Sequence, residues 1–337
     1  MSLRGLAILT GVCLLLAGCG KQDPTVKRVQ ELMNAKSFTE ANSVLEESIA
    51  NNAGNKEYRR LRVKLFLKMG QFAAAEQAYD SLSKISPNDP VLKDSLSDKD
   101  PVIRISAVWT LGLKKDADAV TNLIPAVSDQ EKKVRMAAIT ALGDIRDAKA
   151  VPVLIHALKD SDWEIRAEAA TSLGKIGDGS AAKELFTLMN DPEPYVRDNV
   201  MSALVQLVSP DNKEVFRQAL KSGDEPTRFM SALALARIKD PEATPVLMDV
   251  YPKATPPEQR EIIRAFIQLD TPDVLPVLRD SATHGDSIVR AQSILALGRL
   301  KDEESQPLLE RLAQNTSEPD AVRIAAAVAL KQLALAK

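Results

Sequence analysis

The apolar residues after position 88 recur at helical spacing within a longer period of about 31 residues. An arginine, mostly preceded by Val or Ile, marks each period, and successive arginines are 31, 31, 31, 31, 32, 30 and 33 residues apart. They are Arg104, Arg135, Arg166, Arg197, Arg228, Arg260, Arg290 and Arg323. Alanine usually stands three residues after the arginine and Leu or Ile seven residues after it, which places both on one helical face. The pattern predicts one amphipathic helix per period.

A second helix is predicted in each period. Four first helices are followed by a glycine that we expect to act as the C-cap, namely Gly112, Gly143, Gly174 and Gly298. An aspartate suited to begin the second helix comes next, at Asp116, Asp147, Asp178, Asp240 and Asp302. Such hairpins bury their apolar faces only by stacking on neighbours. The expected fold is therefore all-α, a right-handed α-α superhelix, or α-solenoid, of stacked helical hairpins.

The chain before position 88 repeats with a period of 34 residues. Phe38, Ala41 and Leu45 recur as Phe72, Ala75 and Tyr79. This period resembles the tetratricopeptide repeat, and in the second copy Phe66, Gly70 and Pro87 also occupy that family's positions. The first copy departs from the pattern, with Lys36 at the turn glycine and Ala53 at the proline. We interpret the stretch as two repeats, the first degenerate.

The 31-residue units resemble HEAT repeats, most closely the short form named for phycobilisome lyases. The best copy is Ala-Val-Pro-Val-Leu-Ile-His-Ala-Leu-Lys-Asp over residues 150–160, followed by Ile165-Arg166. Residues 90–98 align with residues 152–160 at an offset of 62, two periods, so they form the second helix of a truncated first unit. We expect the tetratricopeptide-like hairpins to stack directly on the first HEAT helix, giving one continuous curved superhelix.

The N-terminus reads as a targeting segment. Arg4 precedes an uncharged apolar run over residues 5–17, which is long enough for a secretion signal and too short for a membrane span. The run ends in Leu-Ala-Gly-Cys19, which resembles the lipobox of bacterial lipoproteins and implies cleavage before Cys19 and lipidation of its sulfur. An ordinary cleaved signal with a chance cysteine is the alternative. Gly20, where aspartate would indicate inner-membrane retention, favours the outer membrane facing the periplasm.

The predicted domains are a lipoprotein signal peptide over 1–18, a lipidated tether over 19–25, two tetratricopeptide-like repeats over 26–88 and a HEAT array over 89–337. Composition fits this order. Of 337 residues only 14 are glycine and 4% are aromatic, which disfavours sandwiches and barrels. The net charge of −2 argues against nucleic acid as partner. Two histidines and two cysteines are too few for a metal cluster or disulfide framework, and we expect no cofactor, metal site or small-molecule substrate.

Catalytic chemistry is not indicated. His156 and His284 fall four units apart, too far to share one site. The HEAT enzyme deoxyhypusine hydroxylase holds iron with paired His-Glu dipeptides, whereas the dipeptides here are His156-Ala157 and His284-Gly285. We expect the arginines to pair, as in an Asp–Arg ladder between units, with the aspartates four residues ahead: Asp100, Asp162, Asp224 and Asp286. Trp109 and Trp163 are expected to be packing residues. The chain is interpreted as a non-enzyme; a bilin-lyase-like or deoxyhypusine-hydroxylase-like enzyme or accessory factor is the alternative.

The predicted partner-binding surface lies on the second helices, twenty residues after each arginine. In HEAT proteins this column faces the concave side. Its members here, with adjacent His156, are Ile124, Ile155, His156, Phe186, Arg217 and Met248, and the column continues to Arg279 and Glu310. Exposed apolar residues in adjoining units would form a groove for a helix or extended peptide. The alternatives are a wide buried face and a spacer without a groove. The sequence predicts a membrane-anchored scaffold that binds envelope proteins or peptides.

Overall fold

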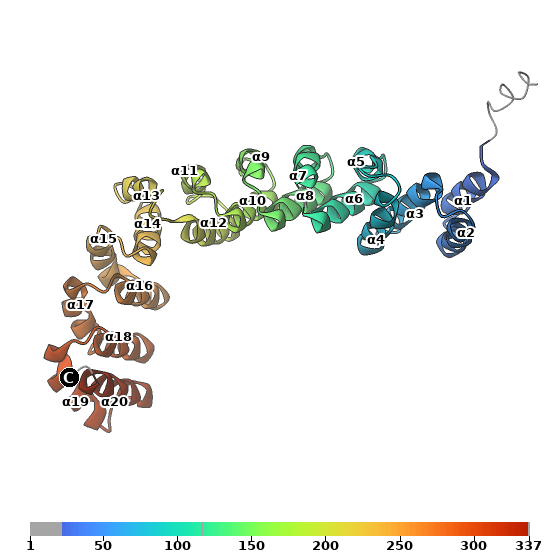
Figure 1. Ribbon diagram of the computed structural model, residues 1–337. Helices are drawn as coiled ribbons and strands as arrows, with labels where there is room; N and C mark the ends of the chain where they lie inside the picture. The colour runs from blue at the N-terminus through green and yellow to red at the C-terminus, as the bar shows by residue number, and fades with distance from the viewer. Residues whose placement is uncertain (1–21, 116, 336–337) are drawn as a thin grey trace, which may run out of the picture. The chain divides into compact units, whose positions relative to one another are not determined.

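The computed structural model describes residues 22–115 and 117–335, and every regular element in these ranges is an α-helix or a short 3-10 helix. The chain divides into two compact units, Met1–Ala141 and Leu142–Lys337. Consecutive helices form antiparallel hairpins that stack within each unit (Figure 1). The all-α solenoid class is thereby confirmed. The signal peptide and Cys19 lie outside the described residues.

Unit 1 contains the tetratricopeptide-like hairpins, the truncated HEAT unit and the first complete one. Its helices are α1 (Pro24–Asn34), α2 (Phe38–Asn51), α3 (Lys56–Lys68), α4 (Phe72–Ser83), α5 (Val91–Ser95), α6 (Pro101–Lys114), α7 (Ala117–Leu123) and η1 (Ile124–Ser128). The following helix, α8 (Lys132–Ile145), spans the boundary between the units. Val29, Leu45 and Leu65 have no exposed surface and form the centre of a core shared by α1, α2 and α3.

The two repeat systems of unit 1 pack directly on each other, as the alignment of the junction predicts. Helix α4 lies against α6, and the Phe72 and Trp109 rings are 6.2 Å apart between centroids. The Thr110 hydroxyl donates to the Phe72 carbonyl at 3.3 Å, and the Lys114 ammonium pairs with Asp80 at 3.0 Å. Trp109 is half-buried, so its predicted packing role is confirmed.

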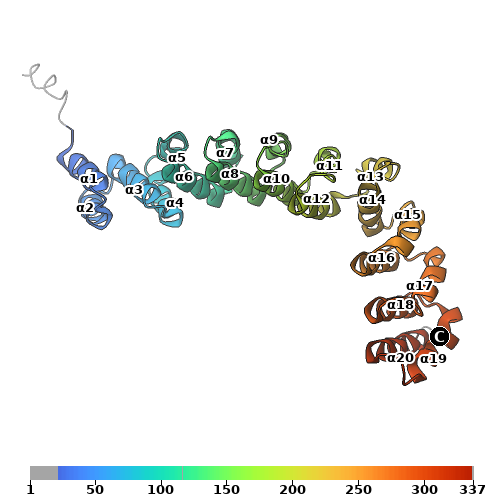
Figure 2. The ribbon, with the colours of Figure 1, turned by 180° about the vertical axis from the view of Figure 1, so that it is seen from behind.

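Unit 2 continues the hairpins. After α8 its helices are η2 (Ala148–Ala150), α9 (Val151–Ala157), α10 (Trp163–Ile176), η3 (Gly179–Ala181), α11 (Ala182–Phe186), α12 (Pro194–Leu207), α13 (Lys213–Ala219), α14 (Glu225–Arg237), α15 (Ala243–Val250), η4 (Tyr251–Lys253), α16 (Pro256–Leu269), η5 (Pro272–Val274), α17 (Leu275–Ser281), α18 (Ser287–Arg299), η6 (Glu303–Ser305), α19 (Gln306–Gln314) and α20 (Asp320–Ala334). First helices of neighbouring hairpins lie side by side, for example α10 with α12 and α18 with α20, as both views show (Figures 1 and 2). Their alanines and leucines, such as Ala169 and Leu173, are fully buried.

The four glycines predicted as C-caps have another role. Gly112, Gly143, Gly174 and Gly298 lie inside the last turn of their helices, and the left-handed residues that follow include Lys115, Arg146, Gly177 and Lys301. A Cβ on Gly298 would lie 2.6 Å from the Ala329 Cα, and one on Gly174 would lie 3.0 Å from the Ala203 Cα. The glycines are needed because the next first helix passes too close for a side chain. The C-cap prediction was wrong.

The sixth unit corrects the arginine register. Gln259, and not Arg260, occupies the position, because its amide donates to the Tyr251 carbonyl eight residues earlier, as the Arg290 guanidinium donates to the Ala282 carbonyl. Counting from Gln259 makes both neighbouring intervals 31 residues. The same shift puts Phe266, fully buried, in the leucine position that sequence assigned to half-buried Ile267.

Candidate binding grooves between the second helices

The arginines form ion pairs, but not with the aspartates predicted from the sequence. Arg104 pairs with Asp129 and Arg166 with Asp191, each through two hydrogen bonds of 2.8 and 2.9 Å. Both aspartates lie 25 residues after their arginine, in the loop that leads to the next first helix. This hydrogen bond from Arg166 lowers the pKa of the Asp191 carboxyl, although partial burial opposes the shift.

The aspartates that precede the arginines are helix N-caps instead. In each case a side-chain oxygen accepts one or two backbone N–H groups of the first turn, in Asp100, Asp162, Asp224 and Asp286. Asp147 and Asp178 cap the 3-10 turns before their second helices, as predicted. Asp116 lies outside the described residues.

A second set of ion pairs ties second helices to the following hairpin. Arg217 in α13 pairs with Asp240 at 2.8 Å and also contacts Glu214 and Glu242. Arg279 in α17 pairs with Asp302 and Glu304. The aspartate side chains are 4% and 3% exposed, so these arginines neutralise buried carboxylates. The guanidinium of Arg217, predicted to face a partner, is already engaged within the fold.

The remaining members of the predicted partner-binding column are only partly accessible. Ile124, Ile155, Phe186 and Met248 are half-buried, and adjacent His156 is exposed. The Phe186 ring packs edge-on against the buried Phe216 at 5.4 Å, which gives it a packing role. The structure does not gather this column into one cavity, and partner binding by these residues stays a prediction.

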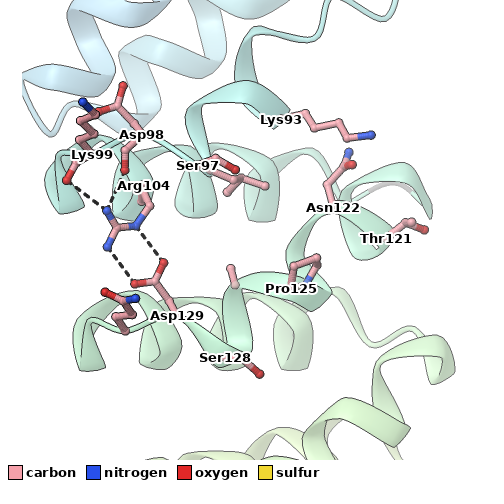
Figure 3. A pocket seen from close by; sticks show the side chains of 13 residues that line it. Lys93, Ser97, Asp98, Lys99, Arg104, Thr121, Asn122, Pro125, Ser128 and Asp129 are labelled. Atoms are coloured by element: carbon pink, nitrogen blue, oxygen red, sulfur yellow. Dashed lines mark hydrogen bonds and ion pairs between the residues drawn. The ribbon is translucent and has the colours of Figure 1, made fainter.

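The largest cavity of unit 1 is an open groove of about 770 Å³ between the short second helices α5 and α7 (Figure 3). Lys93 and Ser97 come from the α5 side, and Thr121 and Asn122 from α7. The Arg104–Asp129 pair closes one end, as the dashed lines in Figure 3 show. Here the hydrogen bond with Asp129 raises the pKa of Arg104, so the pair is fully ionised at neutral pH.

A second groove of about 520 Å³ adjoins the first and shares Lys93 and Asn122 with it. It extends toward Tyr79 on α4, whose ring lies 5.1 Å from the Lys114 ammonium. Polar side chains therefore line the outer surface of α5 and α7 on both sides of Lys93.

The groove recurs in unit 2 at the equivalent place in the repeat. A cavity of about 460 Å³ lies between α15 with η4 and α17, and nine residues line it. Each stands 155 residues, or five periods of 31, after a residue that lines the groove of unit 1. Gln259 takes the place of Arg104, and His284 that of Asp129. The repeat geometry builds the groove, and local sequence sets its chemistry.

Sequence reasoning missed these grooves because it followed the wrong column. The groove positions on the second helix lie 17, 18 and 21 residues after the arginine position, as in Thr121, Asn122 and Pro125, and not 20 residues after it. A signal was present, since this face is polar where the position at 19 residues is a buried Leu or Phe. The helix rotation that turns this face outward is set by packing.

Two searches of the described residues found nothing. No group of three or more His, Cys, Asp or Glu side chains is placed to hold a metal ion among residues 22–115 and 117–335. Over the same ranges no helix has both the length and the apolar content to cross a membrane.

Comparisons with known proteins agree with the repeat assignment. The profile of the family described as HEAT repeats matches residues 88–159, 120–193, 151–214, 182–261 and 252–331, and that described as tetratricopeptide repeat matches residues 32–97. A search of curated proteins finds no match.

Among solved structures, a structure of Kap95p binding to RanGDP aligns with 88% of this chain and 49% of its own, at 12% identity and a TM-score of 0.55. The CpcE–CpcF complex of phycocyanin lyase from Nostoc sp. PCC7120 aligns with 74% of this chain and 97% of its own, at 21% identity and a TM-score of 0.36. Human deoxyhypusine hydroxylase aligns with 77% and 97%, at 22% identity and a TM-score of 0.33. At these identities only the first likeness bears on the fold, and it supports the solenoid.

Proposed function

Because the chain belongs to the family of HEAT repeats, we propose that it is a non-enzymatic scaffold that binds partner proteins along its second helices. The scaffold is held by lipid on Cys19 at a bacterial membrane, most simply the outer membrane facing the periplasm, and recruits or assembles envelope proteins. The anchoring part rests on the lipobox-like Leu-Ala-Gly-Cys19 sequence alone.

The open groove between α5 and α7 is the observation that carries the binding proposal. It is a surface groove with polar walls, which suits an extended segment of a partner better than an enclosed small molecule. The Asn122 amide can both donate to and accept from a peptide group, and the Ser97 and Thr121 hydroxyls add to this capacity. Lys93 and Lys99 outnumber Asp98, because Arg104 and Asp129 neutralise each other. The groove therefore favours a partner segment that carries a carboxylate.

Site-specific photocrosslinking in cells tests this groove. A photoreactive amino acid replaces Lys93, which is exposed and lines both grooves of unit 1. The matched control replaces Lys64, an exposed lysine on α3 that lines neither groove. We expect one envelope protein to crosslink from position 93 and not from position 64, and Asn122→Ala to reduce its yield. Equal crosslinking from both positions, or none from position 93, would contradict the proposal.

The anchor is tested separately with Cys19→Ser. We expect the wild-type chain to incorporate labelled fatty acid and to sediment with membranes, because several acyl chains bind a bilayer stably. The variant should incorporate no label and should leave the membrane fraction. If the variant is labelled and sediments like the wild type, Cys19 is not the anchor.

A further inference from the structure

Two aromatic side chains are exposed at the start of adjacent first helices in unit 2. Trp163 is the first residue of α10 and Tyr195 the second residue of α12. Their rings meet edge to face with centroids 5.7 Å apart. Trp163 is 38% exposed and Tyr195 60% exposed. The sequence-based expectation that Trp163 is a packing residue accounts for only part of its surface.

The other aromatic pairs in the described part of the chain differ in exposure. Phe186 packs on Phe216, which is fully buried, and Tyr251 at 7% exposure packs on the fully buried Phe266. In the Phe72–Trp109 pair the tryptophan is half-buried between helices. Each of those pairs fills space between helices, whereas Trp163 and Tyr195 leave two ring edges and faces open to solvent.

The surroundings of Trp163 and Tyr195 are strongly acidic. Residues 160–168 contain four carboxylates and one arginine, and residues 191–198 contain three carboxylates and one arginine. Asp191 neutralises Arg166, since the two form an ion pair. Glu193 and Asp198 are exposed, and Asp198 is three residues after Tyr195 on α12, so the two share a helix face.

We propose that Trp163 and Tyr195 form a docking site for an arginine- or lysine-bearing segment of a partner protein. An aromatic face attracts a cation, and this attraction increases when nearby carboxylates share the charge. Trp and Tyr also dominate the energetics of protein interfaces because they bury large area at low entropic cost. This site is separate from the groove of unit 1 and does not depend on that groove being occupied.

The site can be tested with a defined probe. The full chain, purified in a neutral detergent with ¹⁵N-labelled tryptophan, should give two indole N–H signals, and Trp109→Phe assigns that of Trp163. The probe is an acetylated and amidated (Arg-Ser)₄ peptide, with (citrulline-Ser)₄ as the uncharged control of nearly the same shape. We expect the arginine peptide to shift the Trp163 signal and not that of Trp109, with an affinity that falls as salt rises. The citrulline peptide should leave both signals in place.

Three variants decide whether the named residues form the site. Tyr195→Ala and the double variant Glu193→Gln/Asp198→Asn should each weaken the arginine peptide about threefold or more, as expected for losing an exposed cation–π contact or its charge support. Ile288→Ala is the matched control, because Ile288 is the second residue of α18 and is 54% exposed. Unchanged affinity in Tyr195→Ala, or equal shifts by the citrulline peptide, would overturn the proposal. Circular dichroism of each variant confirms that the helices are intact.

Discussion

The closeness of the first helices should make Gly298 intolerant of even one methyl group. In Gly298→Ala the new Cβ would lie 2.6 Å from the Ala329 Cα and 2.7 Å from its Cβ, whereas carbon atoms normally approach to about 3.5–4.0 Å. Alanine in a helix gains up to about 1 kcal/mol over glycine. Overpacking costs about 1–3 kcal/mol, and the upper part of that range applies here because the clash is with backbone. The expected net loss is about 2 kcal/mol.

The assay has to locate the effect as well as measure it. Unfolding of a repeat array is not guaranteed to be two-state, so we would follow urea unfolding together with hydrogen exchange of α18 and α20 amides. Gly298→Ala should lower the urea midpoint and speed exchange in these two helices first. Gly223→Ala is the control, because a Cβ there meets no atom within 4 Å. If Gly298→Ala is as stable as the wild type, close approach does not explain the glycine.

Three further outcomes are expected. The pKa of Asp191 lies below its ordinary 3.8 because Arg166 hydrogen-bonds the ionised form, so the pair's contribution is present above pH 3.8 and is lost as pH falls through the lower folded value; Asp191→Asn should flatten the urea midpoint over that window, and an unchanged slope would refute the assignment. Arg217→Ala should lower the urea midpoint more than Arg264→Ala, since it strands the buried Asp240 whereas Arg264 pairs only at the surface; equal losses would contradict this. Elemental analysis of the purified protein should find no stoichiometric iron, and finding it would favour the hydroxylase alternative.

The repeat register could be predicted where one residue type repeats and failed where it is replaced. Seven of the arginine positions stand as the sequence places them, but Arg260 was chosen over Gln259 because arginine was the pattern's mark. The structural requirement is a donor that reaches the carbonyl of the preceding loop, and a glutamine amide meets it. The same limit applies to the ion pairs, because an aspartate four residues ahead is closer in sequence than Asp191, which the next hairpin brings to Arg166.

The sequence by itself determined the all-α class, the hairpin repeat and the junction of the two repeat systems, because helical periodicity and period length are local properties of the chain. Tertiary structure alone decided why Gly298 is glycine, which aspartate neutralises each arginine, and that the outer faces of α5 and α7 open a groove. It also decided that Trp163 meets Tyr195 at the surface. These features depend on the distance and rotation between stacked helices, which are set by the fit of side chains from separate repeats.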